Sequence, residues 1–251
     1  MNWLSPLQDS LSAVGLNVSG VTDGRPYEEQ LAGCRSVVVF ASGGRALWEA
    51  FVADAQANPG HLTDHDHPFD DFVARAIRAA DPDPPPSRRW IRCAAEPEAF
   101  LDFRPLALGA GLGWRSKTGL LLNPEHGLWL GMRAACLTTE VLPQQAALSG
   151  EGPCGDCPGY CADACPGGAF PEGRLQIRAC AAFNVASEVC HGRCDARLAC
   201  PEGAVHRHGP LQHHYHYARD TGRPMLAEVL GVEDGRSGLG PQWAAWSGEE
   251  P

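Results

Sequence analysis

The sequence predicts an α+β protein. Eight of its 11 cysteines lie between Cys154 and Cys200, which marks a separate cysteine-rich module. The β-branched run at residues 37–41 predicts a buried strand, and apolar residues at helical spacing stand before and after it. We therefore expect three parts: an α/β domain over residues 1–145, the cysteine module over residues 146–210, and a C-terminal helix and tail over residues 211–251.

Local patterns in the first part predict a mixture of helices and strands. Trp3, Leu7 and Leu11 stand at helical spacing, and Gly15 suits the end of that helix. Pro105 would kink or divide the last helix of this part. In chain order, the expected elements are helix 1–14, strand 16–21, strand 37–41, helix 46–57, helix 69–80, strand 90–93, helix 97–108, strand 120–123 and strand 128–138.

Two polar or flexible stretches of the first part have two interpretations each. Residues 61–67 hold three histidines and two aspartates, which suits either a metal site or a polar loop before a helix. Residues 109–119 are rich in glycine. Gly111, Gly113 and Lys117 in that stretch suit either the close approach of an anionic ligand or a tight corner of the chain.

Composition narrows the classes of function. The chain has 20 basic and 30 acidic residues and a net charge of −10, so we do not expect nucleic acid as a partner. No apolar run has the length of a membrane-spanning helix, so we do not expect a membrane partner either. The N-terminus lacks the features of a secretory signal, which predicts a cytoplasmic chain with reduced thiols. Three cysteines beside apolar strand patterns are expected to be buried structural thiols: Cys34, Cys93 and Cys136.

The clustered cysteines follow a repeated pattern. Cys165 and Cys200 are each followed by proline, then one residue, Gly-Ala and an apolar residue. In two-cluster bacterial ferredoxins, closely spaced cysteines surround one iron–sulfur cluster, and the cysteine before proline binds the other cluster. This rule assigns two sets of ligands. The first cysteine group is Cys154, Cys157, Cys161 and Cys200, and the second cysteine group is Cys165, Cys180, Cys190 and Cys194.

Zinc and disulfide bonds are the alternatives to iron–sulfur clusters. Two four-cysteine zinc sites could use the same residues. The spacing also departs from the bacterial C-x2-C-x2-C-x3-C-P run, because one residue too many separates Cys157 from Cys161. Pro158-Gly159 is a turn dipeptide that could bulge outward there without moving the sulfurs. The looser spacing around Cys194 leaves open whether both clusters are cubanes.

The last part of the chain is rich in histidine and tyrosine. Residues 206–219 suit a metal site, a proton relay, or a surface helix whose rings shield a cluster from water. A short apolar helix is expected over residues 225–230. Residues 235–251 are expected to form a loose tail in which Trp243 and Trp246 could anchor docking.

Four stretches of the chain resemble epoxyqueuosine reductases and their relatives, the reductive dehalogenases and other cobalamin-linked iron–sulfur proteins. They are the strand-like residues 31–40, the A-G-L-G-W-R-S-K segment at 110–117, the paired segments 127–131 and 138–143, and the cysteine module.

The resemblance implies a nitroreductase-like α/β domain, a ferredoxin-like module with two [4Fe-4S] clusters, and a base-off cobalamin between them. The segment around Asp102 resembles the one that carries the family's catalytic aspartate, but it stands closer to Gly111. Ser116 stands where the family has glycine.

These observations favour an iron–sulfur oxidoreductase or electron-transfer protein. Its two clusters would exchange electrons with a redox partner protein and feed a site in the α/β domain. That site would be cobalamin, another cofactor, or a small-molecule substrate near Lys117. Asp102 is the candidate general acid, and Gly111, Gly113 and Lys117 are the candidates for cofactor binding. Two alternatives stay open: a non-catalytic electron-transfer protein without a corrinoid, and a zinc-stabilised structural module.

Overall fold

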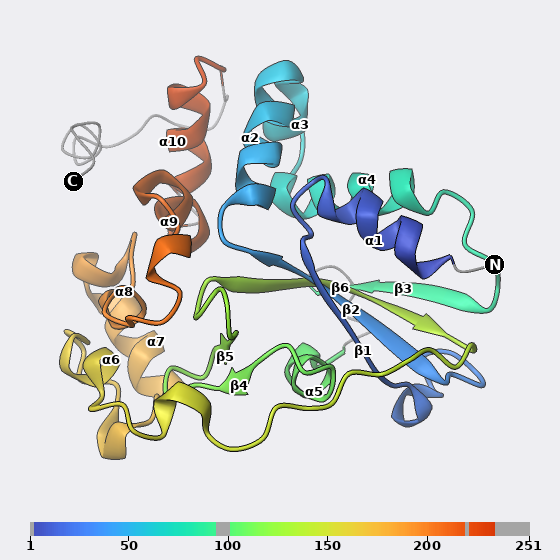
Figure 1. The fold of residues 1–251 in the computed structure, drawn as a ribbon. Helices are drawn as coiled ribbons and strands as arrows, with labels where there is room; N and C mark the ends of the chain where they lie inside the picture. Colours follow the sequence, from blue (N-terminus) through green and yellow to red (C-terminus); the bar gives the residue numbers. More distant parts are fainter. Residues whose placement is uncertain (1–2, 94–100, 219–220, 234–251) are drawn as a thin grey trace.

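A four-stranded antiparallel sheet forms the centre of the first part of the chain (Figure 1). The computed structural model describes residues 3–93, 101–218 and 221–233. The strand order is β1-β2-β6-β3, so the chain adds the late strand β6 between two earlier ones. The strands are β1 (Val18–Asp23), β2 (Ser36–Gly43), β3 (Arg88–Arg92) and β6 (Leu130–Thr138).

Strand β2 is buried along its whole length, as its β-branched sequence predicted. Successive side chains of a strand point to opposite faces of the sheet. Val38 and Phe40 therefore pack into a core on one face, whereas Val37 and Val39 pack into a core on the other. Both faces of the sheet are covered, which explains why this run is apolar at consecutive positions.

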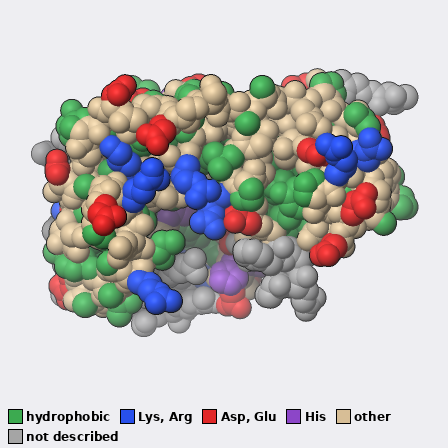
Figure 2. Space-filling model, turned by 90° about the horizontal axis from the view of Figure 1, so that it is seen from below, with side chains coloured by type: hydrophobic (Ala, Val, Ile, Leu, Met, Phe, Trp, Pro, Cys, Tyr) green, Lys and Arg blue, Asp and Glu red, His purple; other side chains and the backbone are tan. Residues whose placement is uncertain are grey.

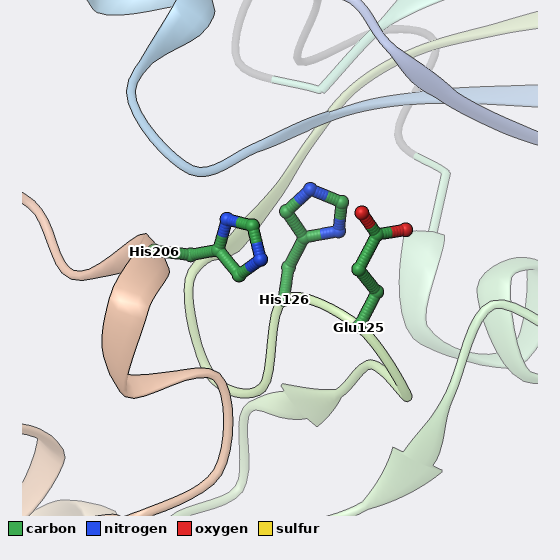
Figure 3. A group of neighbouring side chains, drawn as sticks. All are labelled: Glu125, His126 and His206. Carbon is green, nitrogen blue, oxygen red and sulfur yellow. The ribbon is translucent and has the colours of Figure 1, made fainter.

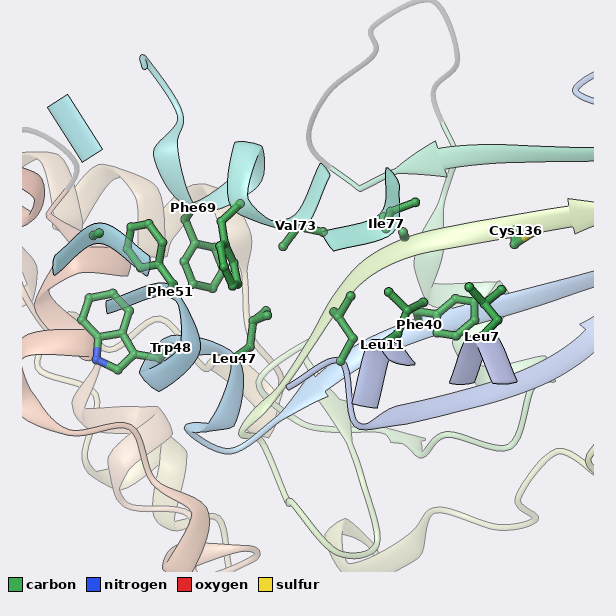
Figure 4. Packing of buried hydrophobic residues seen from close by; sticks show 14 of the residues in the cluster. Leu7, Leu11, Phe40, Leu47, Trp48, Phe51, Phe69, Val73, Ile77 and Cys136 are labelled. Atoms are coloured by element: carbon green, nitrogen blue, oxygen red, sulfur yellow. The ribbon is translucent and has the colours of Figure 1, made fainter. Parts of the chain in front are cut away.

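Helices α1, α2 and α4 cover one face of the sheet, and α5 covers the other (Figure 1). In α4, Phe69, Phe72 and Val73 recur at helical spacing and face the core, where they pack near Phe51 of α2 (Figure 4). The stretch 61–67 lies partly in a short helix, α3, before α4. These elements are α1 (Leu4–Ser12), α2 (Ala46–Ala57), α3 (Gly60–Thr63), α4 (Pro68–Ala80) and the single-turn η1 (Arg25–Tyr27).

Helix α5 (Phe103–Gly109) is shorter than the helix expected over residues 97–108. Residues 97–100 lie outside the described residues. Asp102 caps the helix, since its side chain accepts a hydrogen bond from the backbone N–H of Arg104 at 3.1 Å. Pro105 therefore falls in the first turn, where a missing N–H costs no helical hydrogen bond, and it does not divide the helix.

The strands expected at 120–123 and 128–138 belong to different sheets. Strand β5 (Leu121–Leu122) pairs with β4 (Trp114–Arg115) in a separate two-stranded sheet. Strand β6 joins the large sheet instead, between β2 and β3. Only an isolated bridge between Asn123 and Gly127 closes the turn before β6 among the described residues.

The cysteine module consists of short helices around a small core of its own. Cys161, Ala169, Phe170 and Ala196 are buried there. Most of the segment is loops and single turns, as expected for a chain that wraps around a bound group. Its elements are η3 (Gly152–Cys154), α6 (Tyr160–Asp163), η4 (Pro171–Gly173), α7 (Ile177–Ala186), η5 (Glu188–Cys190), α8 (Asp195–Leu198) and η6 (Ala204–His206).

The C-terminal helices α9 (Pro210–Tyr217) and α10 (Gly222–Val229) pack against the first part of the chain, and α9 also contacts the module. The Tyr215 ring lies 5.0 Å from Trp48 and 5.7 Å from Phe51 between centroids. Helix α9 is thus part of the main core on one side, and the expectation of a surface helix beside the module was incomplete. The predicted tail with Trp243 and Trp246 lies outside the described residues.

The three cysteines outside the module differ in exposure. Cys34 and Cys136 are buried, as expected. Cys93 is exposed, because it follows the last residue of β3 rather than lying within the strand. No helix among the described residues combines the length and the apolar character needed to cross a bilayer.

Candidate functional site

The four members of the first cysteine group lie around one small cavity. Lys117, Ser116 and Thr118 of the glycine-rich stretch line the same cavity. Burial raises the pKa of the Cys161 thiol, and the neighbouring Cys157 and Cys154 raise it further. Thiols crowded in this way lose their protons readily only when a cation is bound between them.

The extra residue before Cys161 is accommodated by a turn. Gly159 takes a left-handed conformation with φ of +103° and begins the short helix α6 that carries Cys161. Glycine adopts this conformation without a steric penalty. The added residue therefore changes the path of the loop and leaves Cys161 facing the cavity, as the turn dipeptide suggested.

The second cysteine group also lies together, around α7, η5 and α8. Burial raises the pKa of the Cys180 thiol, and the nearby Cys194 and Cys165 add to the shift. Burial also raises the pKa of the Cys190 thiol, and the nearby Cys194, Cys165 and Cys180 add to that shift. The sulfur neighbours of Cys180 and Cys190 are thus members of their own group.

Lys117 and the two glycines contact the protein's own backbone. The Lys117 ammonium donates a hydrogen bond to the carbonyl of Cys157 at 2.7 Å and so ties β4–β5 to the first cysteine group. A Cβ atom on Gly111 would lie 2.6 Å from the carbonyl oxygen of Ala146. A Cβ atom on Gly113 would lie 2.4 Å from a backbone oxygen as well. Cofactor binding by these three residues stays a prediction.

Asp102 lies at the start of α5, where its carboxylate pairs with the Arg104 guanidinium at 3.1 Å. The hydrogen bond from Arg104 lowers the pKa of this carboxyl group. A general acid must hold a proton at the working pH, and this pairing opposes that. The catalytic role of Asp102 stays a prediction.

A cavity of about 740 Å³ lies between α4, the end of β3, β6 and the C-terminal helices. Burial lowers the pKa of Arg133 on β6, but a guanidinium stays protonated in proteins. Its Nε donates to the Ser42 hydroxyl at 3.1 Å, and its carbon lies 4.8 Å from the centre of the Phe69 ring. The cavity therefore has a fixed positive charge. Its lining residues are Asp66, His67, Pro68, Phe69, Asp70, Cys93, Arg133, Tyr215, His216 and Arg223.

A band of aromatic rings joins the second cysteine group to this cavity. His213 accepts a hydrogen bond from the backbone N–H of Cys194 at 3.3 Å. Its ring lies 5.8 Å from Trp129, Trp129 lies 5.0 Å from His208, and His208 lies 5.7 Å from His216. We call these four rings, His213, Trp129, His208 and His216, the ring band. His216 then lines the cavity.

The histidines of the ring band are neutral at pH 7. Burial lowers the pKa of His213 to about 4 and that of His216 to about 3, and the nearby Arg197 adds to both shifts. Nε2 of His216 and Nδ1 of His208 are buried without a hydrogen-bond partner. The ring band is thus uncharged, and it reaches the cavity with an unused polar atom.

Sequence reasoning missed the cavity. It named the histidine-rich stretch but not Arg133 or Arg223. A basic residue inside the apolar run of β6 was the available signal for Arg133, because an arginine in a buried strand needs a specific environment.

No protein-family model matches the chain. Two epoxyqueuosine reductases are similar to parts of it. The protein of Listeria monocytogenes is 27% identical over 162 residues, which cover 57% of this chain and 40% of the relative. The protein of a Synechococcus species is 42% identical over 101 residues, which cover 39% of this chain and 30% of the relative. The matches thus span less than half the length of these curated relatives.

Solved structures share the fold. A catabolic reductive dehalogenase in complex with 3-bromo-4-hydroxybenzoic acid superposes with a TM-score of 0.55 and 15% identity, over 94% of this chain and 36% of its own. The chain is a divergent relative of the epoxyqueuosine reductases, and it shares its fold with this reductive dehalogenase.

One epoxyqueuosine reductase structure, with a TM-score of 0.52 and 15% identity over 81% of this chain and 66% of its own, contains an epoxyqueuosine-modified tRNA stem loop. This neighbour conflicts with our expectation, drawn from net charge, that nucleic acid is not a partner. A local basic surface can bind phosphates on an acidic protein. Lysine and arginine side chains gather on the side of the molecule shown in Figure 2, and Arg104, Arg115, Lys117 and Arg174 line a second cavity, of about 400 Å³.

Proposed function

We propose that this relative of the epoxyqueuosine reductase group is an iron–sulfur oxidoreductase. Its two cysteine groups would each hold a [4Fe-4S] cluster, and the 740 Å³ cavity would hold the group that receives the electrons. The observation that carries the proposal is the gathering of the first cysteine group around one cavity. The bound clusters would supply one-electron transfer.

The spacing of the sulfur atoms supports clusters over zinc. A tetrahedral zinc with Zn–S bonds of 2.3 Å would hold its sulfur atoms about 3.8 Å apart. In the part of the chain that the structure describes, no three cysteine sulfurs all lie within 4.8 Å of one another. Cysteines on a cubane bind different iron atoms and stand farther apart. The cysteine groups therefore fit a cubane better than a single zinc ion.

Cobalamin is the proposed occupant of the 740 Å³ cavity. The buried Nε2 of His216 needs a hydrogen-bond partner, and the amide groups around a corrin ring can donate to or accept from an imidazole nitrogen. Arg133 would hold a negative charge on the bound group or on the substrate, and Asp70 lies beside it. The ring band would exclude water between the second cysteine group and the cavity. A non-catalytic electron-transfer protein differs from this proposal in leaving the cavity without a corrinoid.

Metal analysis of the protein purified without oxygen tests the proposal. Two cubanes require about eight iron and eight sulfide per chain. Cys154→Ser and Cys190→Ser should each remove about half of both, because they belong to different cysteine groups. Cys93→Ser, outside both groups, is the matched control and should change neither. A colourless protein with two zinc ions, or full iron content in both module variants, would overturn the proposal.

Cobalamin binding is a separate measurement. Titration of the anaerobic protein with cob(II)alamin should give saturable changes in the absorption spectrum of the corrin. Arg133→Met should weaken this binding while leaving the iron content unchanged, since Arg133 lines the cavity and no cysteine of either group does. If the iron-loaded protein binds no cobalamin, the non-catalytic electron-transfer protein is the function that remains.

A nucleic acid substrate is the second candidate, favoured by the basic 400 Å³ cavity. Arg115 is exposed in that cavity, and Lys117 in it also contacts the first cysteine group. Binding to a tRNA stem loop through these residues should weaken steeply with salt. Arg115→Ala should reduce the affinity and its salt dependence, whereas binding that does not change in Arg115→Ala would contradict this candidate.

A further inference from the structure

We propose a divalent transition-metal site at the contact between the turn before β6 and the end of the cysteine module. Glu125, His126 and His206 each offer one ligand atom there, and these three atoms lie within 4.8 Å of one another (Figure 3). Two residues come from the turn that precedes β6, and His206 ends η6. None of the three is a cysteine-group member or lines the cavities described above.

The residue types suit such an ion. Two imidazoles and one carboxylate are a common donor set for zinc and for iron(II), with the remaining positions open to water. Ligand atoms 2.0–2.2 Å from a tetrahedral zinc lie about 3.4 Å apart. Atoms within 4.8 Å therefore need to move by only about 1 Å, and Glu125 is exposed and free of core packing.

Asn123 holds the His126 side chain in place. Its Nδ1 lies 3.2 Å from the side-chain oxygen of Asn123, which also accepts hydrogen bonds from the backbone N–H groups of Glu125 and His126. Because this oxygen accepts hydrogen bonds, Nδ1 is the protonated nitrogen, which donates to it. The lone pair then stays on Nε2, and a ring N–H bound to an oxygen is the usual support behind a metal-binding histidine.

The surrounding glycines leave room for both rings. A Cβ atom on Gly43 would lie 2.4 Å from both Cδ2 and Nε2 of His126 and 2.6 Å from Cε1. These nearly equal distances place Gly43 over the face of the ring, so the in-plane lone pair is not blocked by that residue. The His206 ring lies 4.4 Å from the His126 ring between centroids.

The site would join two parts of the molecule. A Cβ atom on Gly203 would lie 2.4 Å from the carbonyl oxygen of His126, so the segment after Cys200 packs directly on the turn. An ion shared by Glu125, His126 and His206 would crosslink this contact. It would hold the segment that carries one ligand of the first cysteine group against the α/β domain.

Zinc is the probe for the experiment, because it has no redox chemistry that would disturb the clusters. The full chain, purified anaerobically with its own metal content, is incubated with ZnCl₂ and freed of unbound zinc. Wild type is expected to retain one zinc per chain more than His206→Ala. His61→Ala is the matched control: His61 pairs with Asp54 away from the site and should retain as much zinc as wild type.

Zinc-edge X-ray absorption of the wild-type protein identifies the ligands. A shell of nitrogen and oxygen at about 2.0–2.2 Å is expected, and a shell made only of sulfur at about 2.3 Å would place the zinc on cysteines and overturn the proposal. Equal zinc content in wild type and His206→Ala would overturn it too. If His206→Ala does not fold, the wild-type absorption spectrum alone decides between these outcomes.

Discussion

Gly127→Ala perturbs the contact between the cysteine module and the turn before β6. Gly127 has a φ of +56°, and a Cβ atom there would lie 1.9 Å from the carbonyl oxygen and 2.4 Å from the carbonyl carbon of Glu202. Both atoms belong to backbone, which cannot rotate away as a side chain can. The segment after Cys200 would have to move for the alanine to fit.

The expected loss in the free energy of unfolding is the sum of two separate costs. The left-handed conformation costs about 1–2 kcal/mol for a residue with a Cβ atom. Overpacking against a fixed neighbour costs about 1–3 kcal/mol more. We therefore expect Gly127→Ala to lower the free energy of unfolding by about 2–5 kcal/mol, and to lower the iron content because Cys200 moves with the segment.

Gly231→Ala separates the two costs. Gly231 has a φ of +66°, but a Cβ atom there would meet no heavy atom within 4 Å. This control should lose about 1–2 kcal/mol and no iron. Thermal unfolding of the anaerobic protein and iron analysis give both quantities. Equal melting temperatures and equal iron in the two variants would refute the contact between Gly127 and Glu202.

Two further predictions concern the core and the ring band. Phe51→Ala removes a fully buried ring and should lower the free energy of unfolding by about 3–5 kcal/mol. Val185 is 89% exposed, so Val185→Ala should stay within about 0.5 kcal/mol of wild type. Equal losses in thermal unfolding would place Phe51 outside the core. The second concerns pH. The pKa of His216 is lowered to about 3, so between pH 6.5 and 3 the unfolded chain binds one more proton at this residue, and stability falls as pH falls. His216→Phe should reduce the loss of stability from pH 6 to pH 5 by about 1.2 kcal/mol, seen in melting temperatures, and unchanged slopes would contradict a buried neutral His216.

Local sequence patterns predicted most of the helices and the central strand. Strand β2 was found because its consecutive β-branched residues need burial on both faces. The partner of β6 was not found. Apolar runs on both sides of a Pro-Glu-His-Gly turn look like a hairpin locally, but the 130–138 strand pairs with β2 and β3, far away in the sequence. Pairing over such distances depends on the whole core, which no local pattern contains.

The candidate site, too, could be predicted from the sequence only in part. Two cysteine groups could be proposed from sequence because cluster ligation imposes short spacings and a Cys-Pro repeat, and their assignment as ligands stays a prediction. The 740 Å³ cavity could not be predicted from the sequence, since Arg133, Cys93 and His216 come from three distant segments. The ring band was anticipated only in part: the histidines were visible in the sequence, whereas Trp129 joins them through the fold.

The contacts between the parts bear on how the module would work. Lys117 holds the carbonyl of Cys157, Arg197 of the module donates to the carbonyl of Leu128 at 2.7 Å, and His213 accepts from the N–H of Cys194. Each contact is a hydrogen bond between the module and a different neighbouring segment, and two of them involve cysteines assigned as ligands. Hydrogen bonds next to cluster ligands are among the factors that set the reduction potential. If the module holds the proposed clusters, the first part of the chain and α9 would tune their potentials, and a change in either would alter electron transfer without touching a cysteine.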